Sequence, residues 1–198
     1  MSRPVDAASQ APYTTKSICL SAVLAAVVFI MTFVPRIPIP LGYAHLGDAV
    51  IFLSFLYFNR REAALAAAIG SCLSDFLGGF PLWIAPTFVI KYVMVFIVFA
   101  ICCRGTQKSA LYSVRTLIAF LLSSLWMAIA YTLAGAVLFG SIQAGLASLP
   151  GLLMEGLLNT IAAMGAGSSE EQTTAQEPSG QHTVRRRDGT TEEDCTHQ

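Results

Sequence analysis

The sequence predicts an all-α, polytopic membrane protein with six transmembrane helices, both chain ends in the cytoplasm and a disordered C-terminal tail. Three observations lead to this fold class. The chain of 198 residues is 55% hydrophobic and 12% charged, whereas the surface of a soluble domain needs about a quarter charged residues. The apolar residues form six runs, and the basic residues gather on one predicted side of them.

The six runs are judged by length, because a helix needs about 20 mostly apolar residues to cross a hydrocarbon core of about 30 Å. Proline-rich segment 35–40 stops the first run, and Gly78, Gly79 and Pro81 end the third. The second run is short and begins with polar residues. The predicted spans are 17–34, 43–58, 62–77, 82–103, 116–139 and 147–166.

Outside the predicted membrane domain 17–166, the chain is polar. Residues 1–16 form a predicted cytoplasmic segment. Residues 167–198 have almost no large apolar side chains and cannot build a packed core. We therefore expect a disordered cytoplasmic tail.

The basic residues predict the orientation, because lysine and arginine concentrate in cytoplasmic loops. With the N-terminus inside, Arg36 alone falls in a predicted outer loop, and Lys91 lies within a span. Both ends are therefore predicted to be cytoplasmic. The basic residues on the inner side are Arg3, Lys16, Arg60, Arg61, Arg104, Lys108, Arg115, Arg185, Arg186 and Arg187.

Several classes of function find no support in the sequence. A net charge of zero and scattered basic residues argue against a nucleic-acid partner. Walker A, HExxH and GxSxG motifs and clustered His/Cys ligands are missing from the sequence. The chain is therefore predicted not to be an enzyme and to need neither a cofactor nor a metal.

Four ionisable residues lie inside predicted spans, where each charge costs about 2.5–3.5 kcal/mol on insertion scales. At about 1.5 Å of rise per residue, Asp48, Asp75, Lys91 and Glu155 all lie roughly 9–13 Å below the outer surface. They come from four different spans. Asn159 lies roughly 18 Å deep by the same reckoning. This shared depth predicts a polar site that is open to the outside.

A structural role is the alternative for each of these residues. Lys91 could neutralise Asp75 or Glu155 and so hold the helices together. Asp48 could cap the N-terminus of the second helix.

Two further residues belong to the same region. His45 lies where the outer loop enters the second span, and it is either an interfacial side chain or part of the site. Gly42 and Gly47 on either side allow a close backbone approach. Tyr131 lies in mid-span and could either pack or stack on a ligand ring.

Small residues four positions apart mark surfaces for close helix packing. The third span has such a row at Ala66, Gly70, Ser74 and Gly78, for which we expect an internal neighbour. Ala22 and Ala26 form a shorter row in the first span, and their use is open.

Three segments of the chain carry a resemblance to a known family: PIPLGYAHLGDAVIFL, SDFLGGFP and FVIKYVM. Through them the chain resembles the substrate-binding S components of energy-coupling factor (ECF) transporters, and among these the riboflavin-transporter-like family. The resemblance covers roughly residues 15–166. It implies a six-helix protein in the cell membrane of a prokaryote that binds a vitamin or vitamin precursor from outside. The implied partners are a transmembrane coupling subunit, which docks on Ala22 and Ala26, and two ABC ATPases. The long polar tail departs from the family pattern.

Carried onto this chain, the resemblance assigns substrate binding to residues of the outer loop and the outer span halves, most of which the depth argument also selects. These are His45, Asp48, Asp75, Lys91, Tyr131, Glu155 and Asn159. Flavin-, pyridoxine- and pyrimidine-like compounds all suit such groups.

Two other functions compete with this one. A stand-alone secondary transporter or channel could be driven by protons through Asp75, Lys91 and Glu155. A membrane-embedded enzyme would need a nucleophile–base pair, which the sequence does not offer.

Overall fold

The computed structural model describes residues 14–39, 42–103 and 110–175. Within these residues the chain forms six α-helices, a hairpin of two short strands and one 3-10 helix. In chain order they are α1 (Thr15–Phe33), β1 (Ile37–Ile39), β2 (Gly42–Ala44), α2 (Gly47–Tyr57), α3 (Arg60–Leu77), η2 (Pro81–Trp83), α4 (Ile84–Cys102), α5 (Val114–Leu138) and α6 (Ile142–Ala175).

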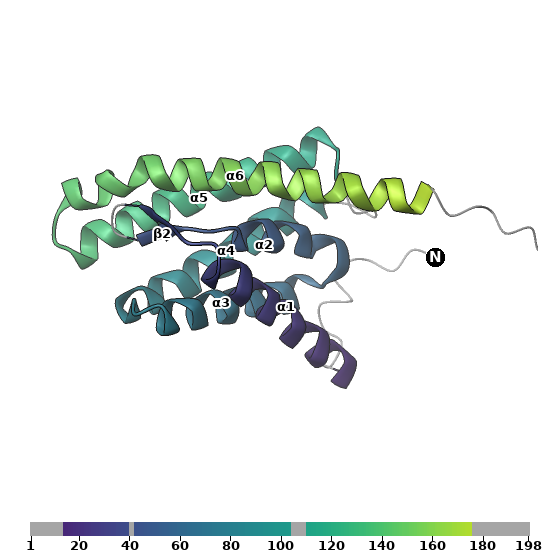
Figure 1. Ribbon diagram of the computed structural model, residues 1–198, viewed down its shortest axis with the longest axis horizontal. Helices are drawn as coiled ribbons and strands as arrows, with labels where there is room; N and C mark the ends of the chain where they lie inside the picture. Colours follow the sequence, from purple (N-terminus) through teal and green to yellow (C-terminus); the bar gives the residue numbers. More distant parts are fainter. Residues whose placement is uncertain (1–13, 40–41, 104–109, 176–198) are drawn as a thin grey trace, which may run out of the picture.

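The short helix α2 lies at the centre of the bundle. Helix α1 packs on α3, α3 on α4, α4 on α5 and α5 on α6, while α2 contacts α1, α3, α4 and α6. Figure 1 shows α2 between the α5–α6 pair and the α1–α3 pair. A helix surrounded in this way has to be apolar on all sides. Accordingly Ile51, Phe52 and Phe55 are each at most 1% exposed.

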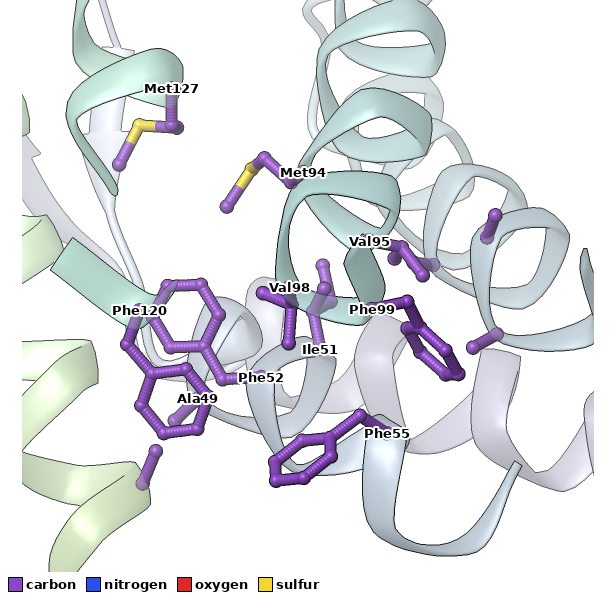
Figure 2. Packing of buried hydrophobic residues seen from close by; sticks show 14 of the residues in the cluster. Ala49, Ile51, Phe52, Phe55, Met94, Val95, Val98, Phe99, Phe120 and Met127 are labelled. Atoms are coloured by element: carbon purple, nitrogen blue, oxygen red, sulfur yellow. The ribbon is translucent and has the colours of Figure 1, made fainter. Parts of the chain in front are cut away.

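Aromatic rings fix α2 against its neighbours (Figure 2). The ring of Phe52 stacks on that of Phe120 in α5, with centroids 4.8 Å apart and planes 11° apart. Phe55 meets the same ring edge-on at 6.1 Å. Met94 of α4 is fully buried beside them. Such aromatic pairs contribute about 0.5–1.5 kcal/mol beyond the burial of their area, so the rotation of α2 is well determined.

Helix α3 turns its small residues inward and its large ones outward. The large side chains Ile69, Leu73 and Phe76 are 54%, 45% and 63% exposed. On the inner face, a Cβ added to Gly70 would collide with the carbonyl oxygen of Ala25 in α1. The expectation that this row packs internally is therefore confirmed. The buried small residues of α3 are Ala63, Ala64, Ala66, Ala67, Ala68, Gly70, Ser71 and Ser74.

Four helical segments of the described chain are long and apolar enough to cross a membrane, and they lie close to four of the predicted spans. Helix α2 has 11 residues, which is about 16 Å of helix against a core of about 30 Å. Helix α3 carries Arg60, Arg61, Glu62 and Asp75. The count of six spans therefore stays a prediction. The four segments are Thr15–Phe33, Pro81–Cys102, Val114–Leu138 and Ile142–Ala166.

The sequence-based boundaries need three corrections. The all-α prediction omits the hairpin, in which Ile37 pairs with Ala44. This hairpin takes up the start of the second predicted span, so α2 begins at Gly47. Helix α6 continues to Ala175, beyond the predicted end of the last span, and the remainder of the predicted tail, 176–198, lies outside the described residues.

We expect Gly70→Ala to lower the melting temperature of the detergent-solubilised protein, because the methyl group would force α1 away from α3. Overpacking of this kind costs about 1–3 kcal/mol. Gly165→Ala in α6 is the matched control, because no atom of another described element lies within 4 Å of its added Cβ and alanine favours a helix. Equal melting temperatures for the two variants would contradict the close α1–α3 contact.

Candidate functional site

An ion pair between Asp48 and Lys91 lies at the centre of the predicted site. Lys91 Nζ in α4 lies 2.5 Å from Asp48 Oδ1 in the first turn of α2, and the two side chains are 1% and 0% exposed. The ion-pair partner of Lys91 is therefore Asp48, which contradicts the alternative in which Lys91 pairs with Asp75 or Glu155. An ion pair this deeply buried holds α2 and α4 in one register, because separating it would leave two uncompensated charges.

Asn159 of α6 ties the start of α2 to the loop before it. Its Oδ1 accepts a hydrogen bond from the Ala49 N–H at 2.8 Å. Its Nδ2 donates to the carbonyl oxygens of His45 at 2.7 Å and of Glu155 at 2.9 Å. Both amide hydrogens and the amide oxygen are thus in use, and the side chain is fully buried. Asn159 therefore acts on the shape of the site by holding the loop in place.

His45 connects the same loop to Glu155. The backbone N–H of His45 donates to Glu155 Oε1 at 3.2 Å, and Nδ1 lies 3.3 Å from the same oxygen. Nδ1 also accepts the N–H of Gly47 at 3.2 Å. Burial, followed by the charge of Lys91, lowers the pKa of His45 to about 4, so the imidazole is neutral at neutral pH.

The alternative role of Asp48 as a helix cap is not what the structure shows. Asp48 is the second residue of α2 and its side chain bonds to Lys91. Two of the first N–H groups of the helix are satisfied, that of Gly47 by His45 Nδ1 and that of Ala49 by Asn159 Oδ1. A helix N-terminus needs such acceptors, and here they come from the loop and from α6.

A second network converges on Asp75 of α3. The Tyr43 hydroxyl donates to Asp75 Oδ1 at 3.0 Å, and the Thr87 hydroxyl donates to Oδ2 at 2.5 Å. The Tyr131 hydroxyl in turn donates to Thr87 Oγ1 at 3.0 Å. Two hydroxyl groups thus donate to the carboxyl group of Asp75, and a third donates to one of these two, which joins the hairpin, α3, α4 and α5.

The two networks meet at Tyr131, whose ring centroid lies 5.5 Å from Lys91 Nζ, a cation–π distance. All seven sequence-predicted residues therefore lie in one region at the hairpin end of the bundle. We call this set, with two residues that sequence reasoning missed, the polar cluster. It comprises Tyr43, His45, Asp48, Asp75, Thr87, Lys91, Tyr131, Glu155 and Asn159.

Arg36 lies at the edge of the polar cluster and was not predicted to belong to the site. Its guanidinium carbon lies 4.1 Å from the ring centroid of Phe33 and 4.4 Å from that of Tyr43. It also donates to the carbonyl oxygen of Ser74 at 3.3 Å. The available signal was its position as the one basic residue of the predicted outer loops. Thr87 gave no such signal, because a threonine in an apolar helix is common.

Comparison with known proteins places the chain in a family. The model of the family described as "ECF-type riboflavin transporter, S component" matches residues 13–167. The chain belongs to this family. It is therefore an S component, a membrane protein of a transport system, as its sequence predicted.

One similar solved structure supports the fold. A structure described as "Structure and mechanism of the S component of a bacterial ECF transporter" aligns with a TM-score of 0.62 and 17% sequence identity. The alignment covers 80% of this chain and 97% of the other. A comparison with curated proteins gives no match.

Two other predictions about this S component concern its surface and metals. Ala22 and Ala26 are exposed on α1, on the face opposite the buried Leu24 and Val28. Within residues 14–39, 42–103 and 110–175 no three His, Cys, Asp or Glu side chains are grouped as metal ligands.

Lys91→Met should strongly destabilise this S component, because Asp48 would remain buried without its counter-ion. Breaking a buried pair in this way costs about 3–5 kcal/mol, which thermal unfolding in detergent would detect. Lys16→Met, at an exposed position, is the control. The double variant Asp48→Asn/Lys91→Met should recover most of the loss, since neither charge is then left alone. A Lys91→Met protein as stable as the control would refute the pair.

Proposed function

We propose that this S component binds a vitamin or vitamin precursor from outside the cell and delivers it inward together with a transmembrane coupling subunit and two ABC ATPases. The observation that carries the proposal is the polar cluster. Its residues come from the hairpin and its following loop and from five different helices, yet hydrogen bonds and a cation–π contact link them around one buried ion pair. A membrane protein retains such costly groups where they have a function.

We infer that the polar cluster faces the outside of the cell. The basic residues favour a cytoplasmic N-terminus and C-terminus. In Figure 1 the beginning of α1 and the end of α6 lie toward the same end of the molecule, and the hairpin lies toward the other. If α2 and α3 also cross the membrane, the chain crosses it six times. An even number of crossings leaves both chain ends on one side, as the basic residues and the positions of the helix ends suggest. We place the protein in the plasma membrane of a prokaryote.

The chemistry of the polar cluster suits a small polar heteroaromatic compound. Carboxylate oxygens accept hydrogen bonds, the Lys91 ammonium donates them, and the Tyr131 ring offers a face for stacking. Flavin-, pyridoxine- and pyrimidine-like compounds have matching edges and rings. The description of the family favours a flavin among them.

The energy for uptake has to come from partner subunits, because the sequence contains no Walker A motif. The exposed face of α1 is the proposed contact with the coupling subunit. Small residues there would allow a partner helix to approach closely. The alternative remains a proton-coupled transporter or channel that uses Asp75, Lys91 and Glu155 without partners.

Purification of the chain alone, followed by mass spectrometry of the small molecules that accompany it, tests ligand binding. Uptake is then measured in liposomes with and without an ECF module. We expect a bound vitamin-like compound, no ATP hydrolysis by the chain alone, and uptake only in the presence of the module. Uptake by the isolated chain that depends on a pH gradient would favour the proton-coupled alternative.

Ala22→Leu/Ala26→Leu should weaken co-purification with the coupling subunit and leave ligand affinity unchanged, because both residues lie on the lipid-exposed face of α1. The matched control is Ala85→Leu/Ala147→Leu, two exposed alanines on α4 and α6. If both double variants retain the coupling subunit equally well, α1 is not the docking helix.

A further inference from the structure

One atom of the polar cluster is without a partner. Asp48 Oδ2 is buried, and no hydrogen-bond donor of the described chain reaches it. The other buried side-chain atoms in this condition are hydroxyl oxygens of Thr32, Ser71 and Thr132 and the Arg36 Nε. A hydroxyl group can donate or accept and Nε can only donate, whereas Asp48 Oδ2 is an acceptor that shares a negative charge. Leaving such an atom unpaired costs about 1–3 kcal/mol or more.

The other carboxyl groups of the polar cluster already have donors. Both oxygens of Asp75 accept hydroxyl hydrogens, from Tyr43 and Thr87. Glu155 Oε1 accepts the backbone N–H of His45, and Glu155 Oε2 is not among the buried atoms without a partner. The unsatisfied hydrogen-bond acceptor of this region is therefore Asp48 Oδ2.

The charged groups of the polar cluster also favour a ligand that donates a hydrogen bond over one that carries a negative charge. Among the described residues it holds three carboxyl groups, on Asp48, Asp75 and Glu155, against the ammonium of Lys91 and the guanidinium of Arg36 at its edge. An anionic ligand group at Asp48 Oδ2 would meet the negative charge that this carboxylate shares, in a medium of low dielectric constant where the repulsion is strong.

Lys91 adds a donor next to the open acceptor. Its ammonium carries three hydrogens, one of which serves Asp48 Oδ1. Acceptor and donor thus lie side by side. This pattern complements a ligand edge on which an N–H group adjoins a carbonyl oxygen or a ring nitrogen, as in imides, lactams and aminopyrimidines.

We infer that Asp48 is a specificity-determining residue. It accepts a hydrogen bond from an N–H group of a neutral or cationic heteroaromatic ligand. This inference rests on the proposed function. Ligands whose recognised group is a carboxylate or phosphate are rejected. A site built to hydrogen-bond an N–H group discriminates strongly against an analogue that lacks it, because the buried protein atom is then left unpaired. Since Asp48 is 0% exposed, the loop that carries His45 has to move for the ligand to enter.

Binding to the purified full chain is measured by titration calorimetry with two matched ligand pairs. One pair is riboflavin and 3-methylriboflavin, and the other is thiamine and its N,N-dimethylated aminopyrimidine analogue. In each pair methylation removes the N–H donor. Nicotinate and pantothenate serve as anionic probes. We expect the pair that binds to favour its N–H member by about tenfold or more, and neither anion to bind.

Asp48→Asn tests the assignment to this residue. The amide oxygen would stay with Lys91, so the amide N–H₂ group would face the ligand N–H and the preference for the N–H member should be lost. Asp48→Asn/Lys91→Met, which removes both charges of the pair, should lose it as well if the single variant does not fold. Glu62→Gln, a carboxylate bonded by Ser17 and Asn59 away from the polar cluster, should keep the preference.

The outcomes separate the inference from the function on which it rests. Equal affinity within the pair that binds, tightest binding by an anion, or a preference that survives at full size in both Asp48 variants overturns the role of Asp48 while leaving vitamin binding intact. Absence of binding by every probe, together with absence of uptake when the ECF module is added, overturns the proposed function and the inference with it.

Discussion

The buried ion pair of Asp48 and Lys91 constrains the positions of the two helices that carry it. Either charge alone would cost several kcal/mol in an apolar interior, so α2 and α4 have to be held at one height and one rotation. The stacking of Phe52, one turn beyond Asp48, provides the rotation. Close contact of α1 at Thr32 with Gly47, where a side chain would not fit, fixes the start of α2. The apolar core and the ion pair are therefore parts of one arrangement.

The hairpin and the loop after it depend on the same arrangement. Tyr43 bonds to Asp75 on α3, and His45 bonds to Glu155 and Asn159 on α6. These contacts also satisfy two of the first N–H groups of α2 through His45 and Asn159. The same contacts thus hold the loop in place and cap the central helix. Movement of the loop would expose helix N–H groups and carboxyl groups together.

The exterior of the bundle is apolar, in contrast to the polar cluster inside it. Large apolar side chains such as Val23 on α1, Ile69 on α3 and Ile161 on α6 are 60%, 54% and 68% exposed. Small residues meet where helices cross, as at Gly70. Lipid removes the usual reason to bury large apolar side chains, and close packing of small ones then holds the helices together. This leaves the interior free to hold polar groups of the kind a transported solute needs.

The sequence by itself determined the class of protein, four of the spans and seven of the nine residues of the polar cluster. Length and hydropathy specify a helix in lipid locally, and the cost of a buried charge makes residues such as Lys91 and Glu155 conspicuous. Only the tertiary structure decided which groups pair. Lys91 pairs with Asp48, although its estimated depth in the membrane was equally compatible with Asp75 or Glu155. Side-chain pairing depends on the rotation of the helices and on the path of the hairpin, which depth does not specify. Arg36, Tyr43 and Thr87 joined the site for the same reason: their contacts are made across elements that local sequence does not relate.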